Sequence, residues 1–172
     1  QGELDCMIGR ATVIEAGDNL SEDVLYAQRP ALIANAALVE RLRKGRVSLS
    51  TLASMDWILP SFATPTGKMI IEIFAKAEVP LPFPKIETYS ADVIEDLLLA
   101  STSFVSLVAE EIAIDICRNE KIARLPFLFE ERLPPISFIR HQRKTPVSAE
   151  QNFAAIFKEV CDHFETSAIA GR

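Results

Sequence analysis

Apolar residues along the chain follow two patterns, short unbroken runs and runs at helical spacing. In the segment 56–77, an apolar run at 57–59 predicts a strand, and a hydroxyl-rich stretch at 60–66 predicts a loop. The positions that follow are spaced as on one face of an amphipathic helix: Met69, Ile70, Ile73, Phe74 and Ala77. Thr64 is a good N-cap for this helix. Pro65 suits its first position, where proline's missing N–H costs nothing.

The same alternation recurs on both sides of this segment and predicts an α/β protein with a largely parallel sheet. We expect strands or extended segments at 3–10, 20–35, 57–59, 85–88, 104–108, 122–128 and 136–140, and further helices at 47–53, 91–100, 109–119 and from Ser148 onward. The unbroken apolar run at 3–10 predicts a strand buried on both faces. The last helix is expected to pack through Phe153, Ile156, Phe157, Val160 and Phe164.

The composition is that of a folded protein without a nucleic-acid surface. Of the 172 residues, 49% are hydrophobic and 24% are charged, which is enough to build a core. The formal net charge of −6 argues against direct nucleic-acid binding, because such surfaces are normally basic. A short basic run falls in a predicted loop and is expected to be solvated: Arg41, Arg43, Lys44 and Arg46.

The cysteines indicate a reducing compartment, so we expect a cytoplasmic protein. They are three in number, widely spaced, and without a CxxC pair. Two histidines far apart do not suggest a metal site. No apolar run approaches the roughly 20 residues of a membrane span. The chain begins at Gln1 without a methionine, which suggests a piece of a longer protein.

The candidate binding residues are hydroxyls at a predicted helix start. Ser61, Thr64 and Thr66 are expected there, where the helix dipole and free N–H groups favour a carboxylate or another anion. Simple helix capping explains the same residues and is the commoner role. Arg10 follows the first strand, and its guanidinium suits either a ligand carboxylate or a nearby acidic side chain. Ser90 is expected to cap the helix at 91–100.

Catalytic motifs do not occur in the sequence. There is no GxGxxG, P-loop, HExxH or GxSxG segment, and neither histidine lies in a loop beside a suitable serine. The acidic residues stand at predicted helix starts and in loops. We therefore expect a domain that holds a small polar ligand without changing it, and that uses no cofactor and no metal.

Seven segments occur in a recognisable order over almost the whole chain: GELDCMIGR, VSLSTLASMDWILP, PSFATPTG, IETYSADVIEDLLLAS, SFVSLVAEE, LPPISFIR and NFAAIFKEVCDHF. Together they resemble the effector-binding domain of LysR-type bacterial transcription regulators. The similarity is greatest to the branch named for regulators of sugar-binding-protein genes, the galactose-binding-protein regulators. Thr102 to Phe104 and Ala109 depart from the glycine and proline that the family usually has around its SLVP-like strand.

This resemblance implies the type 2 periplasmic-binding-protein fold, in which two crossing strands join two α/β lobes and the effector lies between the lobes. Residues 1–27 and 135–172 would form part of lobe I, and 28–134 would form lobe II. The positions that the resemblance and the residue patterns together assign to the effector are Arg10, Ser61, Phe62, Thr64, Pro65, Thr66, Gly67, Ser90 and Phe138.

The resemblance also implies the partners. The effector would be a sugar, a sugar acid or a carboxylate, and its binding would alter the geometry of a DNA-bound homodimer or tetramer. The family's N-terminal DNA-binding domain and the opening part of lobe I are absent from this sequence, so DNA contact is expected only through those parts. No membrane contact is implied. A solute-binding protein of a transport system is the alternative, against which the unpaired cysteines and the lack of a visible signal peptide argue.

Overall fold

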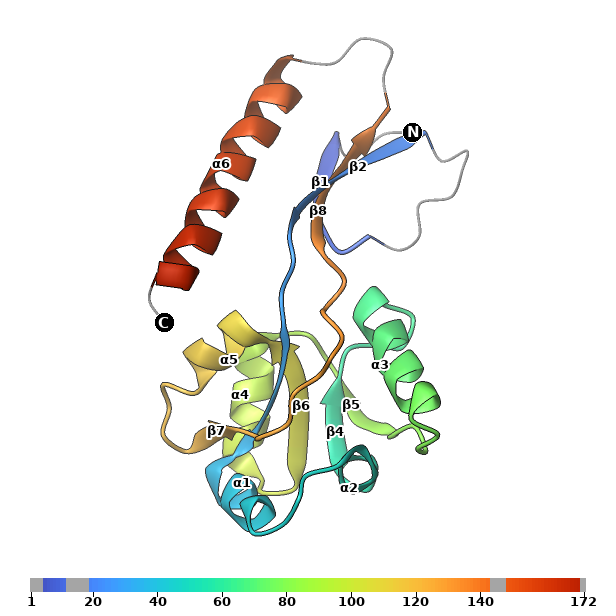
Figure 1. The fold of residues 1–172 in the computed structure, drawn as a ribbon, viewed down its shortest axis with the longest axis vertical. Coiled ribbons are helices and arrows are strands. Elements are labelled where there is room, and N and C mark those ends of the chain that lie inside the picture. Colours follow the sequence, from blue (N-terminus) through green and yellow to red (C-terminus); the bar gives the residue numbers. More distant parts are fainter. Residues whose placement is uncertain (1–4, 12–18, 143–147, 171–172) are drawn as a thin grey trace. The chain divides into compact units, whose positions relative to one another are not determined.

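The computed structural model describes residues 5–11, 19–142 and 148–170, and the chain divides into two compact units (Figure 1). Unit 1 combines Gln1–Gln28 with Pro134–Arg172, and unit 2 is Arg29–Leu133. The chain therefore passes between the units twice, after residue 28 and after residue 133. Each unit has its own sheet and its own core.

Unit 2 is built on a five-stranded mixed sheet with the strand order β5-β4-β6-β3-β7. Its strands are β3 (Pro30–Asn35), β4 (Asp56–Leu59), β5 (Pro84–Glu87), β6 (Phe104–Ala109) and β7 (Ile122–Arg124). Its helices are α1 (Ala36–Arg43), α2 (Leu49–Ala53), α3 (Pro65–Lys76), α4 (Ala91–Ala100) and α5 (Glu110–Ile116). β4 is parallel to β5 and β6, whereas β3 is antiparallel to β6 and β7.

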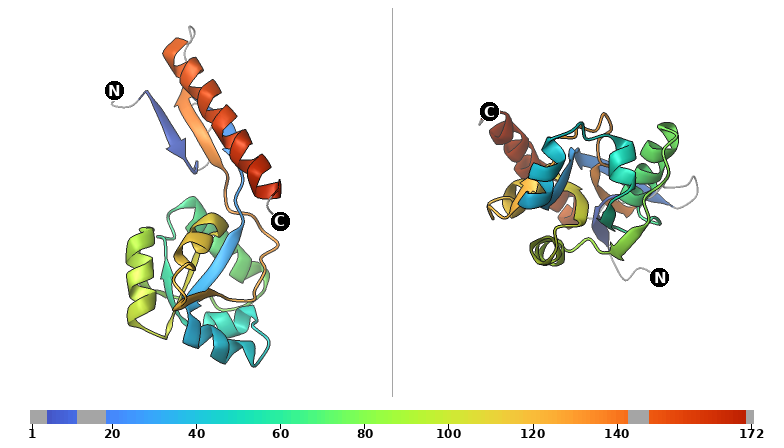
Figure 2. Two further views of the ribbon diagram at one scale, coloured as in Figure 1. Left: turned by 90° about the vertical axis from the view of Figure 1, so that its left-hand side faces the viewer. Right: turned by 90° about the horizontal axis from the view of Figure 1, so that it is seen from below.

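Helices cover both faces of this sheet (Figure 2). Successive side chains of a strand point to opposite faces, so β4 sends Trp57 and Leu59 into one core and Ile58 into the other. Side chains of α1, α2 and α3 pack on the Trp57 side, and side chains of α4 and α5 pack on the Ile58 side. Burial on both faces explains why the strands β4 and β6 are almost uninterrupted apolar runs.

Trp57 holds three elements of unit 2 together. It is fully buried, and its indole Nε1–H donates to the Leu52 carbonyl oxygen in α2 at 2.8 Å. Its ring meets Phe74 of α3 edge to face, with the ring centroids 6.2 Å apart. The hydrogen bond pairs the one polar group of a large buried side chain, so the full apolar surface stabilises the core without an unsatisfied donor.

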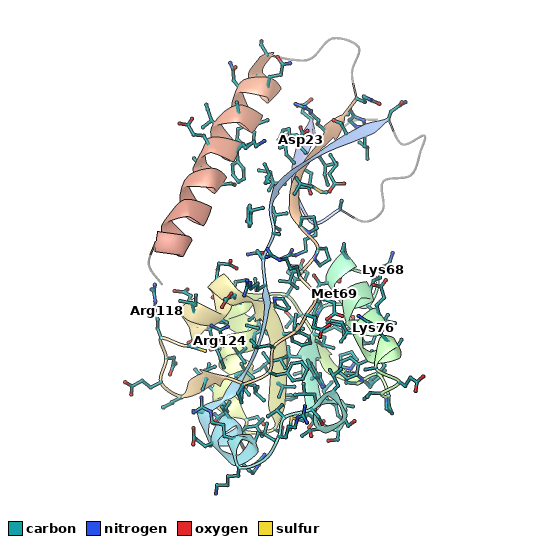
Figure 3. The ribbon with its side chains drawn as sticks, in the orientation of Figure 1. Asp23, Lys68, Met69, Lys76, Arg118 and Arg124 are labelled. Atoms are coloured by element: carbon teal, nitrogen blue, oxygen red, sulfur yellow. The ribbon has the colours of Figure 1, made fainter. Side chains whose placement is uncertain are left out.

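Unit 1 is smaller and has an antiparallel sheet with the strand order β1-β8-β2. Its elements are β1 (Cys6–Gly9), β2 (Leu20–Tyr26), β8 (Ile136–His141) and the helix α6 (Ser148–Ala170). α6 packs against the sheet through Ala154, Phe157 and Cys161. Asp23 of β2, which is labelled in Figure 3, pairs with Arg140 of β8 at 2.9 Å. The core of unit 1 is thus one layer between a sheet and one helix.

The capping predictions around the central helix are confirmed. The Thr64 side chain accepts from the Gly67 N–H and Pro65 is the first residue of α3, while Ser48 and Ser90 cap α2 and α4 in the same way. Each hydroxyl satisfies a backbone N–H that has no partner inside its own helix. The strands expected at 57–59, 85–88 and 104–108 and the helix at 91–100 are also present, with bounds shifted by at most one residue.

The prediction that the basic run lies in a loop is wrong for its first half. Residues 36–43 form α1, and Arg41 and Arg43 occupy its last turn, where cations are favourable because the helix dipole is negative at that end. The side-chain oxygen of Asn35 accepts from the Ala37 N–H at 3.0 Å and begins the helix. Asn35 and the later Gly45 are the start and stop signals that mark this helix in the sequence.

Three predictions about packing are also wrong. The sheets are not largely parallel, because β3 and all of unit 1 pair antiparallel. β1 is not buried on both faces, since it is an edge strand with Met7 and Ile8 exposed. Of the predicted core face of α6, Ile156 is 63% and Val160 45% exposed, because the narrow sheet offers one stripe of contact, whereas the Phe153 ring contacts Phe138 of β8. The side chain of Phe164 lies outside the described residues.

Candidate functional site

The carboxyl ends of three parallel strands share one edge of the sheet in unit 2. β4, β5 and β6 end there, and α3, α4 and α5 begin just beyond (Figure 1). We call the residues 60–67, 88–91 and 109–111 the helix-start edge. Because the first turns of helices present unpaired N–H groups and partial positive charge, such an edge favours negatively charged or strongly polar ligands.

The three helix starts differ in charge. The first turn of α3 contains no acidic residue, that of α4 contains Asp92, and that of α5 contains Glu110 and Glu111. Lys68 adds a positive side chain near the start of α3, on the exposed side opposite the buried Met69 (Figure 3). The start of α3 is therefore the most favourable of the three for an anion.

The loop before α3 is held by Thr64 and Ser61. The Thr64 Oγ1 donates to the Ser61 carbonyl oxygen at 2.7 Å and accepts from the Gly67 N–H at 3.1 Å. The Thr64 backbone N–H also donates to the Ser61 carbonyl oxygen, at 2.9 Å. Since the hydroxyl proton of Thr64 is already used, this side chain serves the loop and the cap.

Gly67 allows α3 to touch this loop directly. A Cβ atom at position 67 would lie 2.3 Å from the Ser61 carbonyl oxygen and 2.6 Å from the Phe62 Cα. Both neighbours are backbone atoms, which cannot move aside without reshaping the loop. Glycine is required here for close approach of two backbone segments, and the Phe62 side chain packs against the Trp57 core below.

Thr66 and Ser61 are the hydroxyls left for a ligand at this edge. Thr66 is half-buried in the first turn of α3, and its hydroxyl has no hydrogen-bond partner among the described residues. Ser61 Oγ accepts from the Ala63 N–H at 3.4 Å, a long bond that uses one lone pair. At the neighbouring helix start, Ser90 Oγ accepts from the Val93 N–H at 3.5 Å. These hydroxyls can still donate or accept towards a polar ligand.

Arg10 lies in unit 1, one residue beyond the end of β1. Its guanidinium donates to the Pro134 carbonyl oxygen and to the Gln28 Oε1. Gln28 and Pro134 are the residues of unit 1 next to the two passages into unit 2. Both of these acceptors are neutral.

One thiol of unit 2 has a shifted protonation equilibrium. Burial raises the pKa of the Cys117 thiol, and the positive charge of Arg124 acts in the opposite direction. Arg124 also pairs with Glu110, at 2.9 Å. A thiol with a raised pKa is protonated at pH 7 and is a poor nucleophile or metal ligand. In the described parts of the chain, no three His, Cys, Asp or Glu residues gather as a metal site, and no helix there is long and apolar enough to cross a bilayer.

The sequence matches the family model of the LysR substrate binding domain over residues 1–162. The chain belongs to this family. It is accordingly an effector-binding domain of the LysR type of transcription regulator, with the type 2 periplasmic-binding-protein-like fold.

Similar proteins agree with this assignment. The HTH-type transcriptional regulator GalR of Pseudomonas putida (strain KT2440) is 24% identical over 125 residues, which are 73% of this chain and 31% of GalR. The regulatory domain of Synechocystis PCC6803 CcmR, solved in complex with 2-PG, has a TM-score of 0.69 at 15% identity and covers 92% of this chain and 74% of that domain. The BenM effector binding domain with its effector benzoate has a TM-score of 0.68 at 17% identity, with 95% and 71% covered.

The predicted site residues are divided between the two units of the LysR domain. Six of them lie together at the helix-start edge of unit 2: Ser61, Phe62, Thr64, Pro65, Thr66 and Gly67. Ser90 begins the neighbouring helix at the same edge, whereas Arg10 and Phe138 belong to unit 1. Phe138 is fully buried with Leu25 and Cys161.

Sequence patterns missed these two acceptors of Arg10. Gln28 lies in a predicted extended segment and Pro134 supplies only a backbone carbonyl, so neither carries a signal that composition or periodicity would reveal. The start of α5 was also overlooked as part of the helix-start edge. Its position follows from β6 being parallel to β4, as the prediction of a largely parallel sheet already implied.

Proposed function

We propose that this LysR domain binds a small acidic or hydroxylated metabolite, and that it passes the binding event to the rest of a transcription regulator. In unit 2 the contacts come from the start of α3, with the hydroxyls of Ser61 and Thr66 and the backbone N–H of Thr66, and from Ser90. Arg10 is the candidate anion-binding residue of unit 1. A sugar, a sugar acid or another small carboxylate has the matching acceptors and charge.

The observation that supports this proposal is the set of polar groups at the helix-start edge. It combines three helix starts, a first turn of α3 without acidic residues, and the Thr66 hydroxyl, which has no hydrogen-bond partner among the described residues. Thr64, Pro65, Gly67 and Phe62 shape the loop that presents these groups. Phe138 packs in the core of unit 1, so we assign it to support of β8 instead of ligand contact.

The named ligands of the solved relatives support an anionic effector. BenM was solved with benzoate, which is a carboxylate, and CcmR with 2-PG. By analogy the domain senses its ligand without transforming it, works in the cytoplasm, and acts within a homodimer or tetramer whose DNA contacts lie in other parts of the regulator. A ligand that binds one conformation more tightly than another shifts their populations, which is how sensing reaches those parts.

Thr66→Val tests this proposal with the smallest change of shape. Thermal shift of the parent regulator is measured against sugars, sugar acids and small carboxylates, since a ligand that binds only the folded state raises the melting temperature. Thr102→Val is the matched control, because Thr102 is exposed and lies before β6, at the opposite edge of the sheet. We expect Thr66→Val to lose the shift and Thr102→Val to keep it. Equal shifts in both variants would contradict the proposal.

A further inference from the structure

The Arg10 side chain extends from the end of the edge strand β1 to the segments next to β8 and β2. The strand order is β1-β8-β2, and Gly9, the last residue of β1, pairs with Ser137 of β8. Arg10 follows Gly9, so its side chain starts beside the beginning of β8. From there the guanidinium donates to the Pro134 carbonyl, which precedes β8, and to the Gln28 side chain, which follows β2. One side chain thus links three neighbouring segments of the chain.

This link lies where the strand pairing stops. The register between β2 and β8 ends at the Tyr26–Ile136 pair, after an irregularity between Val24 and Tyr26. Gln28 and Pro134 lie two residues beyond that pair, each next to a passage into unit 2. Arg10 therefore continues the connection between the two passing segments after the backbone ladder has ended.

The chemistry of the two acceptors suggests how this link responds to a ligand. The Pro134 carbonyl and the Gln28 amide oxygen are neutral, and a carboxylate binds a guanidinium more strongly because both partners are charged and two parallel hydrogen bonds form. An effector carboxylate at Arg10 therefore has an advantage over the Gln28 amide.

We infer that Arg10, Gln28 and Pro134 form a latch that ties the two passing segments together, and that an effector carboxylate takes the place of the Gln28 side chain on Arg10. This inference rests on the proposed function for the identity of the ligand, and it makes Gln28 a positioning residue for the response. Loss of the Arg10–Gln28 bond frees the segment that leads from β2 into unit 2. Ligand binding therefore acts directly on a segment that connects the two units.

Hydrogen exchange in the ligand-free protein tests the latch itself. Arg10→Gln and Gln28→Leu each remove the Arg10–Gln28 bond. We expect the amides of Val24 and Tyr26 to exchange about three- to tenfold faster in either variant, as the loss of one net hydrogen bond allows. Gln151→Leu is the matched control, because Gln151 is exposed on α6, and its exchange should equal that of the wild type. Unchanged exchange in Arg10→Gln and Gln28→Leu would overturn the latch.

Gln28→Glu tests the exchange of acceptors, since it places a carboxylate permanently against Arg10. We expect slower exchange at Val24 and Tyr26 than in the wild type, and the slowing should disappear in the double variant with Arg10→Gln. Acetate, benzoate and malate are then added as carboxylate probes, with benzyl alcohol as a neutral control. At least one carboxylate should speed exchange at these amides in the wild type and leave Gln28→Glu unchanged. No response to any of the three would overturn the displacement of Gln28.

These experiments test the latch independently of the proposed function. The latch variants are read without ligand, so they can behave as expected even where Thr66→Val keeps its ligand response. A lost ligand response in Thr66→Val together with unchanged exchange in Gln28→Leu would retain the binding site and reject the latch.

Discussion

The two units differ in how fully their sheets are covered. Helices pack on both faces of the sheet in unit 2, whereas α6 packs on one stripe of the sheet in unit 1. In unit 1 the exposed apolar side chains lie on the sheet and its helix, with Val24 of β2 57% and Ile156 of α6 63% exposed, whereas the most exposed ones of unit 2, such as Phe83 and Leu128, lie in loops. The comparison shows that the helix-start edge rests on the better-packed support. A binding residue keeps its position when packing fixes the element that carries it.

The largest expected effect comes from a substitution in the core of unit 2. Trp57→Ala removes a fully buried ring and its hydrogen bond to Leu52, and we expect a loss of about 3–5 kcal/mol in the free energy of unfolding. Ile156→Ala in unit 1 is the contrasting change, because that side chain is mostly exposed. We expect it to stay within about 0.5 kcal/mol. Urea unfolding followed by circular dichroism measures both, and similar losses would contradict the difference between the units.

A smaller effect is expected at the contact between α3 and its loop. Gly67→Ala places a methyl group against backbone atoms of Ser61 and Phe62, which costs roughly 1–3 kcal/mol as overpacking does elsewhere. Gly45→Ala is the matched control, since the nearest atom would lie 4.0 Å from its Cβ. The same unfolding measurement compares the two. A loss in Gly45→Ala as large as that in Gly67→Ala would show that the close approach is not the cause.

The caps give a third, finer comparison within unit 2. Thr64→Ala removes an acceptor at 3.1 Å and a donor to Ser61, and we expect a loss of about 1 kcal/mol. Ser90→Ala removes a bond of 3.5 Å, so its loss should be smaller. Chemical denaturation of the two variants under identical conditions gives the order directly. The reverse order would mean that the donor to Ser61 adds nothing.

The smallest effect concerns the Cys117 thiol. Because burial raises its pKa, less thiolate is present at a given pH, and alkylation by iodoacetamide should be slower than for a cysteine in an unfolded peptide. Arg124→Gln removes the charge that lowers this pKa, so alkylation at pH 8 should become slower still. Arg118→Gln is the control, since Arg118 pairs with Asp115 (both arginines are labelled in Figure 3). Faster alkylation in Arg124→Gln than in Arg118→Gln would contradict the assigned cause.

Local signals in the sequence were sufficient for most of unit 2. Thr64 with Pro65, and Ser90 before a first turn that contains Asp92, mark helix starts through hydrogen bonds that form within three residues. Unbroken apolar runs such as β6 predict strands because both faces are covered. α1 carried signals of the same kind in Asn35 and Gly45, and the density of basic residues at its C-terminal end led to the wrong prediction of a loop.

Packing that depends on distant segments was not predictable in this way. The direction of β3 relative to β6 and the exposure of Met7 in β1 depend on which strands meet across the chain. The same holds for Arg10, whose partners are 18 and 124 residues away along the sequence. Spacing within the sequence identified hydroxyls at a helix start, whereas it carried no information on what binds a single arginine.

The most direct test of the central claim is a map of amide chemical shifts by NMR during titration with benzoate and malate. We predict shifts at the amides of Thr66, Gly67 and Ala91, at the helix-start edge. The start of α2 is an internal control, because Ser48 caps it in the same way and α2 precedes β4, at the opposite edge of the sheet. Shifts at Thr51 equal to those at Gly67, or no shifts at the helix-start edge with either ligand, would contradict the claim that this edge binds the effector.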